Sequence, residues 1–392
     1  MGAEVNRPLI LGWGHTAFGR HADESVESLV VAAGREALAD AEVDPASIDL
    51  VVVGQFNSGM NPLGFSSSLA LEIDEALFGT PAVRVENACA SGSTAVHEAL
   101  AHLGSGRADR VLVVGAEKMT GIPPATVGAA LLGADYDAAG TTSETGFAGL
   151  FAEVALEYER RHGPVGDVLG RIGAKSHRLG AQNPFAHLRK DLGVEFCSTV
   201  SAQNPMVAAP LRRTDCSPVS DGAAALVLGR EPTSSRHPGV AVAGWSSAND
   251  FLPNAKRDPL AFAATELAWH RALAEAGVGL ADLDLVELHD CFTIAELNLY
   301  EVLGMAPRGA GHRVVDEGAA LPGGSLPVNP SGGLKSKGHP VGATGVSQHV
   351  LASMQLTGTF PGVQIPNARR AAVHNMGGLA VANCVTVLEA TE

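Results

Sequence analysis

One cysteine stands in a turn directly before a predicted helix, in the sequence Val85-Glu-Asn-Ala-Cys-Ala-Ser-Gly-Ser-Thr-Ala-Val-His97. A short strand is predicted over 82–85 and an apolar helix over 93–103. Ser91 and Ser93 are of types that cap helix N-termini. A thiol in this place meets unpaired backbone N–H groups and the positive end of the helix dipole, which favour the thiolate. Taken alone, Cys89 also fits a small apolar residue in a tight turn, so the other motifs must decide.

A second group of reactive side chains lies in the sequence Glu287-Leu-His-Asp-Cys-Phe-Thr293. Its apolar start indicates the end of a strand, and a helix is predicted over 294–303. Open α/β sheets bind their ligands at the carboxyl ends of strands, so His289 and Cys291 are candidate site residues. No second Cys/His pair has the spacing of zinc ligands, and we therefore predict no metal.

The third motif is a glycine-dense run, Asn329-Pro-Ser-Gly-Gly-Leu-Lys-Ser-Lys-Gly-His-Pro-Val-Gly-Ala-Thr-Gly345. Its spacing is not that of a phosphate-binding P-loop. We interpret it as a loop, too rich in glycine for the core, whose backbone approaches a ligand and which ends with His339 at a helix start. Its candidate substrate-binding residues are Ser331, Gly332 and Gly333. Lys335 and Lys337 are expected to be solvated.

A second glycine turn, Val373-His-Asn-Met-Gly-Gly378, lies between two predicted strands near the end of the chain. We expect it beside the same site. His374 and Asn375 are possible members of that site, although a strand-end histidine that only holds its loop is an equally good interpretation of His374.

Composition limits the class of protein. The chain has 392 residues, of which 46% are hydrophobic and 46 are glycines, which suits a large α/β fold with many tight turns. A net charge of −15 argues against nucleic acid or an anionic membrane as a partner. Five widely spaced cysteines, no targeting segment and no apolar run of membrane-spanning length predict a cytoplasmic protein.

Two parts of the chain repeat each other. Residues 37–51 and 272–286 are offset by 235 and identical at nine of fifteen positions, which predicts a duplicated helix–loop–strand unit. A second alignment, Gly92–Val96 with Gly342–Val346, places Cys89 opposite His339 at an offset of 250. If the halves pack about a pseudo-twofold axis, the two helix starts meet at one site.

The segment between the halves differs in composition, being rich in His, Arg, Asn and Pro. We predict an inserted loop domain over 119–213 that covers the site, with a helix starting at 141–144 and an amphipathic run over 151–161. The predicted domains are therefore an N-terminal half (1–118 and 214–240), the insert (119–213) and a C-terminal half (241–392).

Together, the Cys89 turn, the His289-Asp-Cys-Phe292 motif, the run ending at Gly345 and His374-Asn-Met-Gly377 resemble the thiolases. The order and spacing of these motifs are similar to those of the sterol-carrier-protein-type branch over essentially the whole chain. The resemblance implies a duplicated five-layered α/β/α/β/α fold with an inserted loop domain. It also implies acyl transfer between coenzyme A thioesters in fatty acid or lipid metabolism, with coenzyme A as a substrate and no permanently bound cofactor.

The resemblance also implies roles for individual residues. Cys89 would be the nucleophile that becomes acylated, and His339 would take its proton. Cys291 would protonate the departing acetyl-coenzyme A enolate, and His289 would hold the thioester oxygen. The N–H groups of Cys89 and Gly377 would form an oxyanion hole. A homodimer, or a tetramer, is the oligomer that the resemblance implies.

Some features depart from the pattern and leave alternatives open. Most thiolases carry Cys-x-Gly where this chain has Asn375-Met-Gly377, so Cys384 is expected to be structural, and Cys197 and Cys216 buried and inert. A decarboxylating ketoacyl synthase shares the nucleophile, although the thiol of Cys291 argues against it. The other alternative is an aldolase-like relative that works with a small accessory partner protein.

Overall fold

A nine-stranded sheet organises the molecule, in a computed structural model that describes residues 7–233 and 237–391. The strand order is β3-β2-β4-β7-β1-β8-β11-β10-β9. The strands of the N-terminal half are β1 (Leu9–His15), β2 (Leu50–Gly54), β3 (Ala82–Val85), β4 (Arg110–Glu117) and β7 (Gly222–Gly229), and those of the C-terminal half are β8 (Val240–Asn249), β9 (Leu285–Glu287), β10 (Arg370–Gly377) and β11 (Ala382–Ala390). The prediction of no targeting segment concerns, in part, residues 1–6, which lie outside the described residues.

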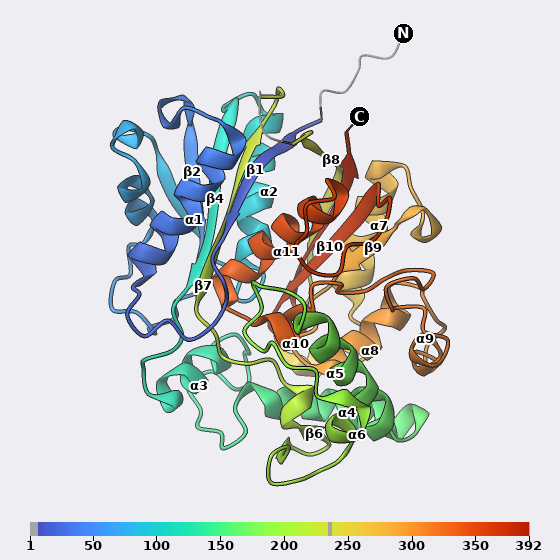
Figure 1. Ribbon diagram of the computed structural model, residues 1–392. Coiled ribbons are helices and arrows are strands. Elements are labelled where there is room, and N and C mark those ends of the chain that lie inside the picture. The colour runs from blue at the N-terminus through green and yellow to red at the C-terminus, as the bar shows by residue number, and fades with distance from the viewer. Residues whose placement is uncertain (1–6, 234–236, 392) are drawn as a thin grey trace.

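The two halves of the sheet join over only two residue pairs, Leu9 with Ala241 and Ile10 with Val240. Helices α2 (Ser91–Gly104) and α11 (Val341–Leu356) lie between the halves, while α1 (Val26–Ala41) packs on the N-terminal half and α7 (Ala263–Ala276) on the C-terminal half (Figure 1). The layers therefore alternate as α/β/α/β/α, which confirms the predicted fold.

The sequence repeat corresponds to repeated structure. Helix α1, the 3-10 turn Pro45–Ser47 and β2 are matched, at the same offset of 235, by α7, the 3-10 turn Leu280–Asp282 and β9. Both helices end in a left-handed residue, which is Glu42 in the first copy and Gly277 in the second. The same turn thus occurs twice, and in the second copy it is formed by glycine, which adopts the left-handed conformation without steric cost.

Glycine explains how α2 and α11 approach each other. A Cβ on Gly92 would lie 2.8 Å from the carbonyl oxygen of Gly342, and one on Gly345 would lie 2.2 Å from the backbone nitrogen of Ser93. The helix backbones are therefore in direct contact, as only residues without a side chain permit. This confirms the predicted meeting of the two helix starts.

Between β4 and β7 the chain leaves the sheet. It forms α3 (Pro124–Leu132), α4 (Phe147–His162), α5 (Gly166–Gly180), α6 (Gly193–Ser198) and the short strands β5 (Met206–Ala208) and β6 (Leu211–Arg212). We propose 119–213 as the inserted domain. Helix α4 begins at Phe147 and not at 141–144, because Ser143 accepts a hydrogen bond from the N–H of Gly146 (3.0 Å) and closes a turn before the helix.

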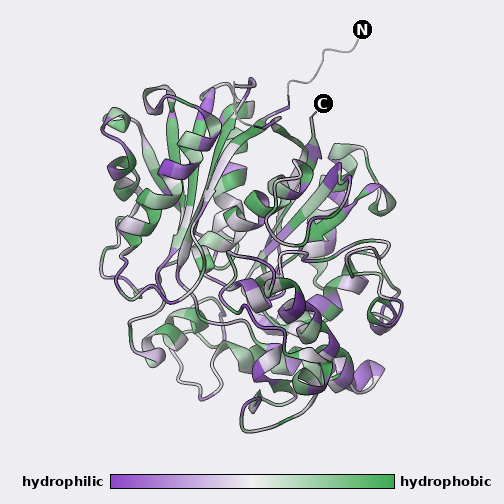
Figure 2. Cartoon of the chain, viewed as in Figure 1, coloured by the Kyte–Doolittle hydropathy of each residue, from purple (hydrophilic) through white to green (hydrophobic). Residues whose placement is uncertain are grey.

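The remaining helices belong to the C-terminal half: α8 (Thr293–Val302), α9 (His312–Asp316) and α10 (Gly333–Lys337). Hydrophobic residues dominate the strands, and hydrophilic residues gather on the outer helices, among them α5 (Figure 2). Within the described ranges, no helix has both the length and the apolar character needed to cross a bilayer.

Candidate active site

Four of the predicted residues lie together at one cavity of about 480 Å³. Cys89 precedes α2, His339 precedes α11, and His289 and Cys291 lie between β9 and α8. The sulfur of Cys89 and a ring nitrogen of each histidine lie within 4.8 Å of one another. All four side chains are buried, so the reaction partners would meet away from bulk water.

Hydrogen bonds within the cysteine turn fix its shape. The hydroxyl of Ser91 accepts from the N–H of Asn87 (2.9 Å) and donates to the carbonyl of Ala88 (2.6 Å), and Ala88 has a positive φ of 49°. A non-glycine residue in this region is strained and persists only where its surroundings hold it. The helix N-cap is Ala90, without a side-chain cap, so the prediction that Ser91 or Ser93 caps α2 was wrong.

The helix start favours the thiolate of Cys89, but burial of the sulfur opposes it more strongly. Burial, as the largest effect, raises the pKa of Cys89 to about 12, and the charge of Glu117 adds to the rise, although the N–H of Gly378 acts in the opposite direction. Loss of water around the sulfur outweighs the helix N-terminus, because the charged form loses most on burial. Cys89 therefore rests as a thiol at neutral pH.

The imidazole of His339 is held in one tautomer. The hydroxyl of Thr344 donates to the carbonyl of Pro340 (2.9 Å), so it must accept from Nδ1–H of His339 (2.7 Å). Nε2 of His339 is therefore bare. Burial, followed by the charge of Lys337, lowers the pKa of His339 to about 3. The imidazole is thus a neutral base.

His289 is held in the opposite sense. The amide nitrogen of Asn375 donates to the carbonyl of Cys89 (3.0 Å) and to Nδ1 of His289 (2.8 Å). Because the carbonyl can only accept, the amide orientation is fixed, and His289 carries its proton on Nε2. Cys89, His289 and His339 have a spacing that a metal ion could use, but His289 then offers an N–H where a metal needs a lone pair. The arrangement suits an oxyanion better.

The second thiol at the cavity is that of Cys291. The backbone carbonyl of Cys291 accepts from the N–H of Ser217 (2.9 Å), and the neighbouring Asp290 carboxylate accepts from the N–H of Leu334 (2.7 Å). Burial, the neighbouring Cys89 and Asp290 raise the pKa of Cys291 well above its usual value. At neutral pH this residue therefore holds a proton that it can give to a stronger base.

The glycine-dense run is not an exposed loop. All of residues 329–345 are buried, because the run packs between α5 and the strand end before α8. Lys335 and Lys337, expected in solvent, are buried as well. Lys337 donates to the hydroxyl of Ser347 (2.7 Å), and Nζ of Lys335 lies 3.3 Å from Nε2 of His177.

The three predicted substrate-binding residues do not line the cavity. The hydroxyl of Ser331 donates to Glu287 (2.7 Å). A Cβ on Gly332 would lie 2.6 Å from the backbone of Gly180, and one on Gly333 would lie 2.1 Å from Asp290. These residues therefore hold the run against its neighbours.

In the last glycine turn, Gly378 and not Gly377 lines the cavity. The N–H of Gly378 acts to lower the pKa of Cys89, whereas Gly377 packs on the carbonyl of Asn87. His374 lies outside the lining, with Nε2 3.4 Å from the Asn383 oxygen.

The other three cysteines have different settings. Cys197 and Cys384 are buried away from the cavity, whereas Cys216 is half-buried and lines it. The expectation that Cys216 is buried is therefore corrected. It lies in the segment that leads back to β7 and pairs with Phe292, which brings its side chain to the cavity wall.

Two positioning residues were missed in the sequence. One is Thr344. The other is Glu117, whose buried carboxylate accepts from the N–H groups of Phe56 (2.9 Å), Asn57 (3.0 Å) and Gly342 (3.0 Å). Glu117 thereby ties the start of α11 to the N-terminal half, although burial raises its pKa to about 7. An acid at the end of an otherwise apolar strand was the available signal.

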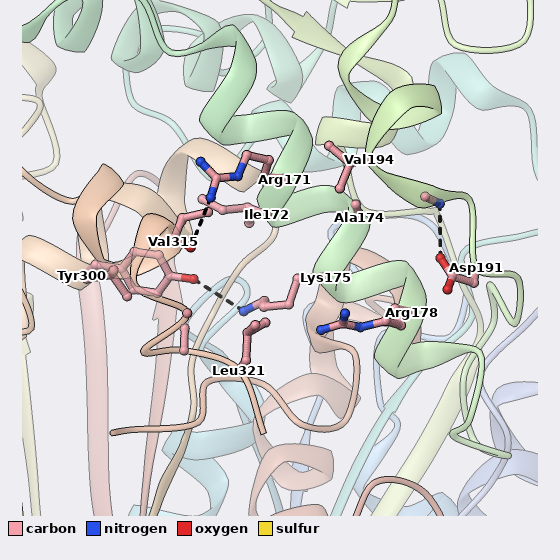
Figure 3. Close-up of a pocket in the computed structure, with 14 residues that line it drawn as sticks. Arg171, Ile172, Ala174, Lys175, Arg178, Asp191, Val194, Tyr300, Val315 and Leu321 are labelled. Atoms are coloured by element: carbon pink, nitrogen blue, oxygen red, sulfur yellow. Dashed lines mark hydrogen bonds between the residues drawn. The ribbon is translucent and has the colours of Figure 1, made fainter. Parts of the chain in front are cut away.

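A second cavity, of about 310 Å³, lies between α5, α8 and α9 and shares no lining residue with the first. Arg171, Lys175 and Arg178 project from α5, and Lys175 lies between Tyr300 of α8 and Arg178 (Figure 3). Lys175 pairs with the buried Glu296 and also approaches the hydroxyl of Tyr300 (3.4 Å). Arg171 pairs with Asp316 of α9 (2.5 Å), so Arg171 and Lys175 tie α5 to α9 and α8, and none of the three cations lines the first cavity.

Comparisons with known proteins agree with this geometry. The family model described as "Thiolase, N-terminal domain" matches residues 9–192, and "Thiolase C-terminal domain-like" matches 247–390. The chain is 34% identical to an acetyl-CoA acetyltransferase of Methanothermobacter thermautotrophicus, over 94% of this chain and 96% of that protein. It is 33% identical to benzoylsuccinyl-CoA thiolase subunit BbsB of Thauera aromatica, over 94% of each chain.

Solved structures show the same fold at lower identity. The Ltp2-ChsH2(DUF35) aldolase has a TM-score of 0.82 at 22% identity, covering 98% of each chain. The acetyl-CoA acetyltransferase from Syntrophomonas wolfei has a TM-score of 0.71 at 19% identity, covering 98% of this chain and 99% of that one. With two relatives above 30% identity along nearly its full length, this chain belongs to the thiolase family.

Proposed function

We propose that the protein transfers acyl groups between coenzyme A thioesters through a thioester on Cys89. In the direction of degradation it would cleave a 3-oxoacyl-coenzyme A with coenzyme A, giving acetyl-coenzyme A and a shortened acyl-coenzyme A. The observation that carries the proposal is the opposite tautomers of the two histidines, since one presents a base and the other a hydrogen-bond donor to the same cavity.

In the first half-reaction, Nε2 of His339 takes the proton of Cys89 while the sulfur attacks the 3-oxo carbon. The oxyanion that forms is held by the N–H groups of Cys89 and Gly378, the latter in place of the predicted Gly377. The C2–C3 bond then breaks. The acyl group stays on the sulfur, and the electron pair goes to the enolate of acetyl-coenzyme A.

The enolate needs a donor for its oxygen and a proton for its carbon. Nε2–H of His289 supplies the first, and the thiol of Cys291 protonates C2. Cys291 recovers a proton in the second half-reaction, when it deprotonates the thiol of incoming coenzyme A and that sulfur attacks the acyl-Cys89 thioester. The sulfur of Cys89 then leaves and takes its proton back from His339. A neutral thiol of high pKa suits the role of Cys291, because it keeps its proton until a carbanion-like base appears.

The alternatives make different demands on the same cavity. A decarboxylating ketoacyl synthase has no use for a thiol at the position of Cys291. The name of one relative, a thiolase subunit, supports a partner protein, and the likeness in fold to the Ltp2-ChsH2(DUF35) aldolase supports a carbon–carbon lyase. Against it stands the retention of Cys89, His339 and Cys291 in one cavity.

For the oligomer we propose a homodimer, with a tetramer as the larger possibility. The supporting observation is the edge of the main sheet, where β3 pairs only with β2. Beside it are Phe78, which is 92% exposed, and Phe65, which is 68% exposed. Large exposed apolar side chains near an open strand edge favour association. We further propose a cytoplasmic enzyme of fatty acid or lipid metabolism.

The test is thiolysis of short, long and branched 3-oxoacyl-coenzyme A substrates by the intact protein and by Cys89→Ala and Cys291→Ala. We expect cleavage that depends on both cysteines. Cys384→Ala is the matched control, because it removes a buried thiol that does not line the cavity, and its activity should stay within about twofold. If the intact protein cleaves no substrate, thiolysis is excluded, and lyase assays with a small partner protein follow.

A further inference from the structure

The walls of the catalytic cavity are almost entirely uncharged. Beyond the two thiols and two imidazoles, its lining is mainly apolar and includes Met119, Ile122, Val127, Leu131, Phe147 and Phe292. Arg20 is the one Lys, Arg, Asp or Glu side chain among the described residues that line it. An apolar channel with a single cation has the shape of a site for an apolar ligand with one anionic group.

Arg20 stands on a firmly held loop. After β1, the N–H of Phe18 donates to the carbonyl of Phe185 (2.8 Å), and Gly19 exchanges two backbone hydrogen bonds with Asp221 (3.1 and 2.7 Å). The side chain is free by contrast. It is exposed, and its guanidinium has no hydrogen bond or ion pair with any residue in the described part of the chain. The loop therefore positions five unused donors at the cavity.

The polar groups around Arg20 do not neutralise it. Asp221 is occupied by Lys118 (2.8 Å), by the N–H of Met119 (2.7 Å) and by the N–H of His21 (3.0 Å). His187, whose Nδ1 lies 2.8 Å from the Ser220 hydroxyl, has its pKa lowered by burial and then by the charge of Arg20. On a chain of net charge −15, no carboxylate among the described residues forms an ion pair with Arg20.

We propose that Arg20 binds an anionic group of the substrate, a phosphate or a carboxylate, at the end of the ligand remote from the reacting thioester. The inference rests on the proposed function, because it takes the substrate to be a coenzyme A thioester whose reactive carbon lies at Cys89. Two parts of such a ligand carry this chemistry. One is a phosphate of coenzyme A, and the other is a carboxylate that ends the acyl chain. A guanidinium pairs with either through two parallel hydrogen bonds.

Binding of inert thioethers tests the proposal without any turnover. The probes are S-butyl-coenzyme A, S-(3-carboxypropyl)-coenzyme A and S-butylpantetheine, which lacks the nucleotide phosphates. Dissociation constants are measured by titration calorimetry for the intact protein, Arg20→Ala, Arg20→Lys and Arg107→Ala. Arg107 is an exposed arginine after α2 that does not line the cavity, so Arg107→Ala removes the same charge elsewhere.

If Arg20 binds a phosphate, Arg20→Ala weakens both coenzyme A thioethers about tenfold or more and leaves S-butylpantetheine unchanged. If it binds an acyl carboxylate, only S-(3-carboxypropyl)-coenzyme A is weakened. In either case Arg20→Lys restores part of the affinity, and Arg107→Ala changes nothing. The inference alone is overturned if the intact protein binds the coenzyme A probes and Arg20→Ala binds all three within twofold. If the intact protein binds no coenzyme A probe, the proposed function fails, and the inference fails with it.

Discussion

Helices α2 and α11 begin at the same cavity, and each carries a reactive residue just before its first turn. In the alignment of the two halves, Thr94 of α2 corresponds to Thr344 of α11. Thr344 accepts a hydrogen bond from the ring of His339, whereas Thr94 accepts one from the side chain of Asn87 (3.2 Å), two residues before the cysteine. Equivalent hydroxyls therefore act differently in the two halves. Thr344 holds the ring of His339, and Thr94 holds the turn that carries Cys89.

The difference follows from the chemistry of the two groups. An imidazole has two nitrogens, so a base must be fixed in tautomer as well as in place. A sulfur has no tautomer and needs only a placed backbone. The surroundings differ in the same way: residues 82–88 are half-buried or exposed, whereas residues 329–345 are buried throughout. In the proposed reaction Cys89 would therefore face the entering substrate, while His339 is held by the buried run behind it.

The largest effect is expected from removing the paired groups themselves. Cys89→Ala and His339→Ala should each lower kcat by about a thousandfold or more, and the double variant should lose little beyond either one, because the two act as a unit. Steady-state thiolysis measures this. Independent, multiplicative losses would contradict the pairing of the two helix starts.

A single methyl group is expected to disturb the close crossing of α2 and α11. Gly92→Ala places a Cβ 2.8 Å from the Gly342 carbonyl and should lower the free energy of unfolding by about 1–3 kcal/mol or more. Gly104→Ala, in the same helix, meets nothing within 4 Å and should stabilise by up to about 1 kcal/mol. Urea denaturation measures both. Equal effects would mean that the crossing is not tightly packed.

The hydroxyls of Thr344 and Thr94 are expected to differ in their importance for catalysis. Thr344→Val keeps the shape but removes the acceptor of the His339 Nδ1–H, so kcat should fall about ten- to a hundredfold with little change in KM. Thr94→Val should lower kcat by less than about threefold, since it only loosens the turn. Thr344→Ser, which restores the hydroxyl, should recover most of the rate. Similar losses of kcat in Thr344→Val and Thr94→Val would contradict the proposed difference between the two hydroxyls.

Alkylation tests the state of the nucleophile. Because burial raises the pKa of Cys89 to about 12, its thiolate fraction, and with it the rate of labelling by iodoacetamide, should rise about tenfold per pH unit between pH 7 and 9. Peptide mass spectrometry separates Cys89 from Cys216, which also lines the cavity. A rate that levels off below pH 8 would instead indicate a resting thiolate.

The smallest effect is expected on the acidic side of the activity profile. In the proposed reaction His339 acts as a base in its neutral form, and because its pKa is lowered to about 3, this form prevails at every pH above that value. The kcat/KM should therefore not fall between pH 7 and 5 through titration of His339. A fall in kcat/KM with a midpoint near pH 6.5, present in both the intact protein and Arg20→Ala, would contradict the neutral state of His339.

The sequence predicted the duplicated fold and the four residues that meet at the cavity, because those depend on motifs and on a repeat at a fixed offset. It failed where burial decides. The solvated Lys335 and Lys337, and the pull of the helix start toward a thiolate at Cys89, were inferred from neighbours along the chain, whereas Gly377 was implied by the resemblance. The number of water molecules that a group loses depends on segments far away in sequence, such as the packing of α5 on the glycine-dense run.

The direct backbone contact of α2 and α11 also affects how the protein is synthesised and folds. The two helix starts are separated by 250 residues, so during synthesis the cysteine leaves the ribosome long before its base. A nascent or truncated chain that ends before α11 carries Cys89 without a proton acceptor. Recovery of activity after dilution from denaturant therefore reports when the halves dock, and it should lag behind the recovery of helical circular dichroism.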